Sequence, residues 1–230
     1  GDHYKMTFSI SYMTAEHYIL VISHDEVVHL KCSMINKMPG YTVDKFANLR
    51  TAYTFMMGHP GKKLLFMGQE FAQLREWSEE RELDWYLLNE PLHKEMQEYV
   101  KKLLHIYKRN PALYLNDSSY DGFEWVNAND ADRSIFSFIR KMPGTWKGAF
   151  LFVCNFTPMA RPDYRVGVPK KKKYTLLLNS DDAKFGGEGT ERPTVYQAEK
   201  SECDGRPYSF AYELPPYGVA IFKFLALIHI

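Results

Sequence analysis

The first half of the chain alternates short apolar runs with stretches of helical period. Residues 18–22 form a continuous apolar run, and residues 64–67 form a second one. Such runs are typical of strands buried on both faces of a parallel sheet. Helical periods fill residues 44–58 and 91–110, the second starting with a proline at the favoured first position. The order strand, helix, strand, helix predicts an α/β barrel or a doubly wound sheet.

The apolar stripe of each expected helix can be read from the residue spacing. The two stripes are Phe46, Leu49, Tyr53 and Met56, and Leu92, Met96, Tyr99, Leu103 and Tyr107. Spacings of three and four residues place each set on one helical face, so both sets are expected in the core.

After roughly residue 115 the helical period stops and short alternating strands follow. The expected strands are residues 123–126, 134–140, 149–155, 174–178 and 218–224. Turn residues such as Met142-Pro143-Gly144 and Pro215-Pro216 separate them. This pattern predicts an antiparallel β-sandwich. We therefore expect two domains, residues 1–114 and residues 115–230, with a boundary near residues 112–120.

Composition narrows the function classes without selecting one. The 230 residues are 45% hydrophobic and 25% charged, as in ordinary globular proteins, and the formal net charge of +1 gives no footprint for nucleic acid or an anionic membrane. The basic run Lys170–Lys173 is interpreted as a solvated turn. The 15% aromatic content fits sugar binding, but aromatic cores use the same property.

The cysteines and the chain ends bear on compartment and cofactors. Cys32, Cys154 and Cys203 are odd in number and far apart, which argues against a disulfide framework and a structural zinc, and favours a reducing, cytoplasmic compartment. No apolar run reaches transmembrane length and no signal peptide opens the chain. No metal or cofactor is expected. The apolar end, residues 225–230, reads as a last strand or as a foreign extension.

Polar side chains follow both strands of the first half. His24-Asp25-Glu26 comes directly after the first strand, and Gly68-Gln69-Glu70 follows the second. Carboxylates at strand ends can converge on a sugar ring, and an imidazole can donate hydrogen bonds to sugar hydroxyls. The alternative is a solvent-exposed loop in which Asp25 caps a helix start. A metal site at His24 and His29 is weaker, because a spacing of five matches no common ligand motif.

The residues after the second strand carry further candidates. Glu70 is a candidate for orienting the floor of a site, through hydrogen bonds or an ion pair with Arg75; plain solvation is the competing interpretation. Trp77 and Trp85 lie beside charged residues, which suits stacking on glucose units, although packing explains a tryptophan equally well.

Taken together, these strings resemble the C-terminal half of bacterial 1,4-α-glucan (glycogen) branching enzymes of the α-amylase superfamily, from about His3 to Phe224. The matching blocks are Ser23–His29 (SHDEVVH), Asn36–Gly40, Lys45–Arg50, His59–Phe71 and Leu83–Trp85, with marks at Phe185–Gly187 and Leu214–Pro216. The resemblance implies that residues 18–22 and 63–67 are strands seven and eight of a (β/α)8 TIM barrel. An antiparallel β-sandwich domain follows them.

The resemblance also implies roles and a reaction. Asp25 would be the transition-state-stabilising carboxylate and His24 a ligand of the sugar, with Glu26, Glu70 and Trp77 as further substrate-binding residues. The family cleaves an α-1,4 link, holds the chain as a covalent glucosyl-enzyme and passes it to a 6-hydroxyl, using a nucleophile and a general acid/base about 5 Å apart. Those two residues lie on earlier barrel strands, so the 230 residues alone are expected to be inactive.

Partners and alternatives follow from the same comparison. The expected partners are an α-1,4-glucan or glycogen, and either the rest of a barrel or a second copy of the chain. The alternative functions are a non-catalytic glucan-binding or scaffold protein, and a parent that hydrolyses α-glucan. Leu30 stands where the family usually has glycine and Val21 where proline is usual, so a different backbone is expected around residue 30.

Overall fold

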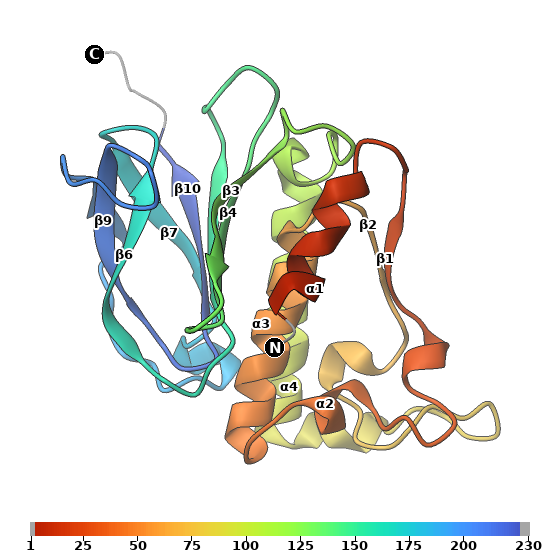
Figure 1. The fold of residues 1–230 in the computed structure, drawn as a ribbon. Coiled ribbons are helices and arrows are strands. Elements are labelled where there is room, and N and C mark those ends of the chain that lie inside the picture. Colours follow the sequence, from red (N-terminus) through yellow and green to blue (C-terminus); the bar gives the residue numbers. More distant parts are fainter. Residues whose placement is uncertain (1–2, 226–230) are drawn as a thin grey trace.

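The structure is a computed structural model that describes residues 3–225. Figure 1 shows a central helical layer with a pair of strands on one side and antiparallel sheets on the other. Of the apolar chain end, residues 226–230 lie outside the described residues, so neither interpretation of that end is tested. None of the helices within residues 3–225 has the length and apolar character that crossing a membrane requires.

The first part of the chain forms a parallel strand pair with short helices around it. Its elements are α1 (His3–Phe8), η1 (Ser9–Tyr12), β1 (Ile19–Ile22), η2 (His24–Glu26), α2 (Met34–Lys37), α3 (Thr42–Gly58), β2 (Lys62–Leu65) and η3 (Gln69–Phe71). Strands β1 and β2 pair in parallel, from Ile19 opposite Lys62 to Ile22 opposite Leu65. Both strands were predicted to within two residues at either end.

Burial of β1 and β2 on both faces, as the apolar runs suggested, is wrong. Ile19 is 55% and Val21 50% exposed, whereas Leu20 and Ile22 pack against the core. Successive side chains of a strand point to opposite faces, and within the described residues only one face of this two-stranded sheet is covered by helices. The opposite face is therefore apolar and open.

Two long helices form the centre of the molecule. They are α3 and α4 (Pro91–Arg109), and η4 (Trp85–Asn89) and η5 (Pro111–Leu113) flank the second. Tyr41 donates its backbone N–H to Asp44 Oδ2 over 2.9 Å at the start of α3. Lys108 and Arg109 lie at the end of α4, where positive charge is favourable. Both predicted stripes pack in the core; Leu92 and Tyr107 alone among their nine residues are only partly buried.

The remaining strands form two antiparallel sheets, as predicted. They are β3 (Phe123–Asp130), β4 (Ile135–Arg140), β5 (Phe150–Asn155), β6 (Arg161–Val168), β7 (Lys173–Asn179), β8 (Val195–Gln197), β9 (Tyr208–Leu214) and β10 (Val219–Phe224), with η6 (Ala183–Phe185) after β7. One sheet has the order β3-β4-β5-β10-β7-β8, and β6 pairs with β9 in the other. The run Lys170–Lys173 is largely exposed and leads from a bend into β7, which begins at Lys173.

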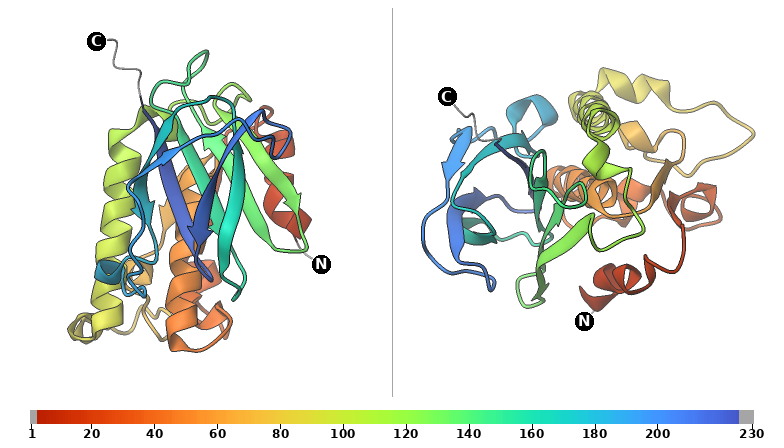
Figure 2. Two further views of the ribbon diagram at one scale, coloured as in Figure 1. Left: turned by 90° about the vertical axis from the view of Figure 1, so that its left-hand side faces the viewer. Right: turned by 90° about the horizontal axis from the view of Figure 1, so that it is seen from above.

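The larger sheet separates two apolar cores. On β5, Phe150, Phe152 and Cys154 belong to the core shared with the helices, whereas Leu151 and Val153 belong to the core between the sheets. Helix α3 thus packs against the sheet on one side and near β1 and β2 on the other (Figure 2). Gly58 permits the close approach, since a Cβ there would lie 2.7 Å from the Phe152 ring.

A fully buried arginine joins the helices to the sheet. Arg140 of β4 donates to Gly58 O over 2.7 Å and to Asp117 Oδ1 over 2.7 Å. Burial acts to raise the pKa of Asp117, but the hydrogen bond from Lys62 and the charge of Arg140 lower it overall. Removing one partner of such a pair leaves a buried charge unpaired, so this network fixes the junction between the helices and the sheet.

Candidate functional site

The parallel pairing brings the two polar segments to one edge. Phe66 N donates to Ile22 O over 2.9 Å, which extends the ladder to the ends of both strands. The segments Ser23–His29 and Gly68–Phe71 therefore begin at neighbouring points. The carboxyl ends of parallel strands are where folds of this type place their chemistry.

His24 and Asp25 lie together in η2 and face solvent. The two atoms His24 Nε2 and Asp25 Oδ1 are 3.3 Å apart, and the side chains are 53% and 70% exposed. Asp25 does not cap the helix. Instead, Ser23 Oγ accepts a hydrogen bond from Asp25 N over 3.2 Å. The Asp25 carboxylate is thus free of capping and accessible to a ligand.

An aromatic wall stands beside His24. The rings of Phe66 and Trp77 meet edge to face with centroids 5.2 Å apart, and the His24 ring lies 5.9 Å from Phe66 and 6.4 Å from Trp77. Trp77 is held there because its backbone N–H donates to Val27 O over 3.0 Å. The sequence identified Trp77 but not Phe66, which reads as an ordinary strand residue.

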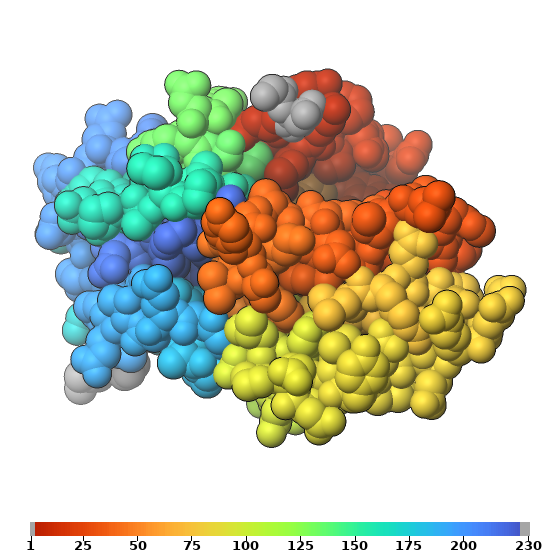
Figure 3. Space-filling view, turned by 90° about the horizontal axis from the view of Figure 1, so that it is seen from below, coloured from red at the N-terminus to blue at the C-terminus, as the bar shows by residue number. Residues whose placement is uncertain are grey.

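Glu76 joins the loop after β1 to the loop after β2. Its carboxylate accepts hydrogen bonds from Leu30 N over 3.1 Å and from Cys32 N over 2.7 Å. Figure 3 shows the corresponding orange and yellow segments side by side on the underside of the molecule. Leu30 has φ +64°, in the left-handed region that glycine adopts freely. Sequence reasoning noted the Leu30 departure but not Glu76.

The remaining predicted residues are less closely gathered. Glu26 Oε2 lies 3.8 Å from Lys37 Nζ. The proposed ion pair between Glu70 and Arg75 is wrong, because Arg75 Nε pairs with Asp84 Oδ1 over 2.8 Å instead. Within residues 3–225 Glu70 makes no hydrogen bond or ion pair. Its charge acts on Tyr53, whose pKa is raised mainly by burial and further by this carboxylate.

The floor behind Glu70 is built on Gln69 and Tyr53. Tyr53 OH donates to Gln69 O over 3.0 Å, and the buried Gln69 Oε1 accepts from Met34 N over 3.4 Å. Trp85, the other tryptophan singled out, packs on Phe71 with ring centroids 5.2 Å apart and is 49% exposed. Its ring contact is with Phe71, whereas the ring of Trp77 is the one that lies near His24.

These residues form an open wall suited to a polar, uncharged ligand. It contains a carboxylate, an imidazole and a partly exposed indole ring, the groups that hold sugar hydroxyls and sugar ring faces. Among residues 3–225, no three His, Cys, Asp or Glu side chains are grouped as a metal site would need.

Comparison with known proteins gives first the class of protein. Residues 125–224 match the family described as the alpha amylase, C-terminal all-beta domain. The crystal structure of an alpha-amylase from H. orenii covers 90% of this chain and 39% of its own with a TM-score of 0.54 at 14% identity. The crystal structure of AmyP in complex with maltose matches 78% of this chain and 35% of its own chain, with a TM-score of 0.52 at 13% identity. The antiparallel sheets therefore have the fold of the C-terminal all-beta domain of alpha amylases.

The sequence relatives are more specific. The 1,4-alpha-glucan branching enzyme GlgB of Butyrivibrio fibrisolvens is 55% identical over 224 residues, covering 97% of this chain and 35% of that protein. The branching enzyme GlgB of Halothermothrix orenii is 47% identical over 221 residues, which cover 96% of this chain and 35% of that protein. The chain thus spans about a third of the length of the curated relatives it matches. The resemblance to branching enzymes that the motifs predicted is confirmed.

Proposed function

We propose that the chain contributes one wall of the active site, and the C-terminal β domain, of a 1,4-α-glucan branching enzyme. In this proposal residues 1–114 carry strands seven and eight of a (β/α)8 barrel, and residues 115–230 form the β domain. The observation that carries it is the parallel pair β1 and β2, which brings the two family motifs to one edge. The identity of 55% to a branching enzyme supports this reaction.

Asp25 is proposed to stabilise the positive charge that develops on the sugar ring in the transition state. Its 70% exposure and lack of a capping role support this, since the carboxylate can face a substrate. His24 donates a hydrogen bond to a sugar hydroxyl, and Trp77 stacks on a ring. Glu26 and Glu70 accept from further hydroxyls. The covalent step requires a nucleophile and a general acid/base, which in this family lie on earlier strands.

The proposed substrate is an α-1,4-glucan or glycogen, and residues 1–230 in isolation bind it without catalysing transfer. A solved neighbour of similar fold is described in complex with maltose. The open apolar face of β1 and β2 supports a further partner, either the rest of a barrel or a second copy of the chain. A cytoplasmic location is proposed on the three unpaired cysteines among the described residues.

A chimera tests the proposal. Residues 1–230 replace the matching third of the Butyrivibrio fibrisolvens branching enzyme, whose remaining two thirds supply the other strands. The chimera should branch amylose, as measured by iodine absorbance and debranched chain length, whereas the 230 residues alone should not. Asp25→Asn in the chimera should lower the rate by about 10²–10³-fold, because a transition-state charge loses its stabiliser.

The matched control is Asp163→Asn, an exposed carboxylate on β6 that should leave the rate unchanged. Branching by the isolated 230 residues, or a chimera indifferent to Asp25→Asn, contradicts the proposal. New reducing ends without α-1,6 links would instead assign hydrolysis.

A further inference from the structure

A cavity separate from the β1–β2 edge lies between helix α3 and the β domain. Its volume is about 270 Å³, and it is lined by Val43, Asp44, Ala47 and Arg50 of α3, Asp181, Gly186–Glu188, Pro216 and Tyr217. The orange start of α3 and the light blue segment after β7 lie side by side on the underside of the molecule (Figure 3). None of these residues belongs to the candidate site.

Arg50 is buried in this cavity without hydrogen bonds from its guanidinium. The residue is 2% exposed, and neither Nε nor Nη1 has a hydrogen-bond partner within residues 3–225. A guanidinium carries five N–H donors, and a buried donor without an acceptor is costly, more so when charged. Burial lowers the pKa of Arg50, because removing the charged guanidinium from water disfavours its protonated form. Arg50, a lining residue of the cavity, therefore carries two buried donors that no acceptor within residues 3–225 uses.

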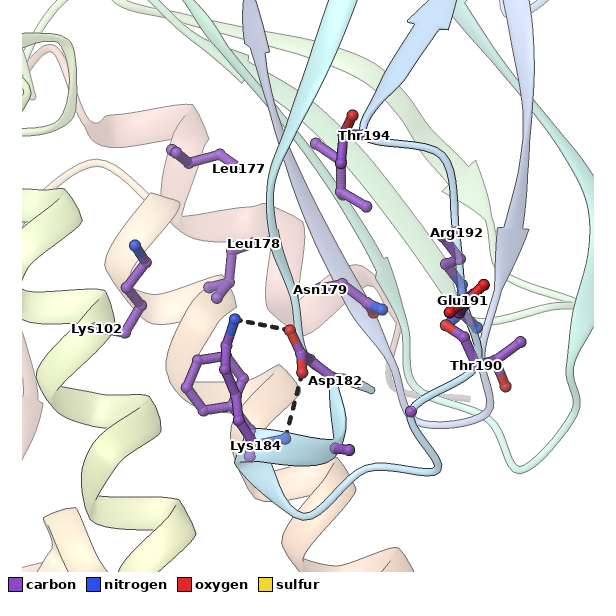
Figure 4. A pocket seen from close by; sticks show the side chains of 14 residues that line it. Lys102, Leu177, Leu178, Asn179, Asp182, Lys184, Thr190, Glu191, Arg192 and Thr194 are labelled. Carbon is purple, nitrogen blue, oxygen red and sulfur yellow. Dashed lines mark hydrogen bonds and ion pairs between the residues drawn. The ribbon is translucent and has the colours of Figure 1, made fainter.

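A larger cavity nearby lacks this property. It has a volume of about 390 Å³ and lies between α4, β7 and the loop at residues 189–194 (Figure 4). Its Lys184 Nζ pairs with Asp182 Oδ2 over 2.8 Å, and Arg192 Nη1 pairs with Asp181 Oδ2 over 3.1 Å. Because Lys184 and Arg192 are already paired, these two cations offer a ligand less than Arg50 does.

The charges around Arg50 select the class of ligand. Three carboxylates line the cavity, those of Asp44, Asp181 and Glu188; because Asp181 is paired with Arg192, two of them remain against the Arg50 guanidinium. This negative surplus disfavours an anion, and a metal cation would meet the Arg50 charge. A hydroxyl group is neutral and both accepts and donates hydrogen bonds. A polyol can therefore accept from Arg50 and donate to the carboxylates at the same time.

The glycine pair of the Phe185-Gly186-Gly187 motif keeps one wall free of side chains. Gly186 has φ +79°, and a Cβ there would lie 2.7 Å from Glu95 Oε2 and 3.6 Å from Arg50 Nη1. A Cβ on Gly187 would lie 2.2 Å from Asp181 O. Side chains at these positions would collide with the groups that shape the cavity. The bare backbone keeps this wall of the cavity open beside Arg50, whose Nε and Nη1 are themselves buried.

We propose that this cavity binds a single glucose unit of a neutral α-glucan, with Arg50 donating to ring hydroxyls and Asp44 and Glu188 accepting from them. The volume is near the lower limit of small-molecule sites, about 300 Å³, which suits one hexose. The choice of glucose among polyols rests on the proposed function, whereas the preference for a neutral polyol does not.

The test is a titration of the 230-residue chain with maltose, followed by amide NMR. The Gly186 and Gly187 amides report on this cavity, and the Trp77 indole N–H reports on the candidate site. Val43 is 62% exposed on the rim, so Val43→Trp should obstruct the cavity and Val43→Ala should leave it open. We expect Val43→Trp to weaken the response of the two glycines about tenfold or more and Val43→Ala to leave it unchanged.

Arg50→Gln should weaken the same response about tenfold or more, as loss of hydrogen bonds from a charged donor predicts. Thermal unfolding of each variant shows whether it folds, and the Val43 pair decides the question if Arg50→Gln does not. Glycine amides that stay unmoved by millimolar maltose, a response equal in Val43→Trp and wild type, or tighter binding of inorganic phosphate overturns the inference.

The two proposals can fail separately. A shift at Trp77 without one at the glycines overturns the Arg50 site and leaves the candidate site standing. A shift at the glycines together with an inactive chimera supports the Arg50 site and counts against the proposed reaction.

Discussion

At the scale of single residues, Leu30 holds an unusual backbone conformation without compensation from packing. Its φ is +64° and its side chain is 95% exposed. The sequence predicted a changed backbone here because the family usually has glycine. In the structure Leu30 instead keeps the left-handed backbone conformation that suits glycine. The backbone course is therefore unchanged, and the leucine is strained.

Replacing Leu30 by glycine should stabilise the protein. An L-residue in the left-handed region costs about 1–2 kcal/mol, while glycine adds up to about 1 kcal/mol of unfolded-state entropy. Leu30→Gly should therefore raise the free energy of unfolding by about 0.5 kcal/mol, measured by equilibrium urea denaturation. Leu115→Gly is the control, since Leu115 is 62% exposed without a positive φ. An equal gain in both variants would rule out backbone strain as the cause.

His59 should make stability depend on pH. Burial lowers its pKa from 6.5 to about 4, while the ring contacts Ser9 Oγ at 2.9 Å and Pro60 O at 2.7 Å. Because the folded pKa lies below the unfolded one, the unfolded state takes up the proton first. Stability is then complete above pH 6.5 and is lost as pH falls towards 4, by roughly 3 kcal/mol in total.

Urea unfolding at pH 7, 5.5 and 4.5 measures the loss of the free energy of unfolding. An NMR titration of the His59 ring shows whether this histidine causes the loss. His105→Gln should keep the wild-type profile because His105 is exposed, whereas His59→Asn should flatten it between pH 6.5 and 4. Asp117 adds acid sensitivity only in its own lower range, below about pH 4. A His59 ring that titrates near 6.5 contradicts the prediction.

The residues of the candidate site divide by how their role arises. His24, Asp25 and Trp77 could be proposed from the sequence, because short motifs and a resemblance identify them. Phe66 and Glu76 could not, because one acts through an edge-to-face ring contact and the other through hydrogen bonds to residues 44 and 46 positions away. The Glu70–Arg75 pair failed for the same reason: sequence proximity did not reveal that Asp84 holds Arg75.

At the scale of elements, the strand pair β1 and β2 is covered on one face. Ile19 and Val21 point away from the core and Leu20 points into it. We expect the double variant Ile19→Thr, Val21→Thr to change the free energy of unfolding by less than about 0.5 kcal/mol and to reduce self-association. Leu20→Thr should cost about 2 kcal/mol, because it removes apolar contacts and buries a hydroxyl.

Light scattering over a range of concentrations, together with urea unfolding, measures both effects. A wild-type chain that is monomeric at all concentrations would show that the open face does not drive association. Equal losses of stability in the double variant and in Leu20→Thr would show that both faces are buried.

The elements themselves were predicted unevenly. Helices α3 and α4 were identified because a 3.6-residue period over four or more turns is a strong signal. Strands β6, β8 and β9 were missed. β8 has only three residues, and β6 contains Pro162 and Gly167, which read as turn residues. β9 does alternate, with Phe210, Tyr212 and Leu214 buried, and a stricter search for a two-residue period would have found it.

At the scale of the whole molecule, the helices and the sheet share one core. Residues from both expected domains, among them Tyr53, Phe55, Phe136 and Phe152, belong to the same apolar cluster. Residues 115–230 expressed alone should therefore expose the sheet face that α3 covers, and should bind a hydrophobic dye or aggregate. The chain of 230 residues should unfold in a single transition, followed by circular dichroism and fluorescence.

Coincident transitions by the two probes are the expected result. A soluble 115–230 piece that binds no dye and unfolds at the same urea concentration as the whole chain would show that the β domain is stable by itself. Control variants on the outer sheet, such as Asp163→Asn, should not change the urea midpoint that either probe reports.

The sequence by itself determined the order of β1, α3, β2 and α4, the antiparallel character of the second half and the two motifs that follow β1 and β2. These depend on local periodicity and on short strings, which neighbouring residues specify together. Only the tertiary structure decided that β1 and β2 leave an apolar face open, that Arg140 joins the helices to the sheet, and that Arg50 is buried without a hydrogen-bond partner near Gly186. Such features arise where segments distant in the chain come into contact. Burial and hydrogen-bond partners are defined only after these tertiary contacts have formed.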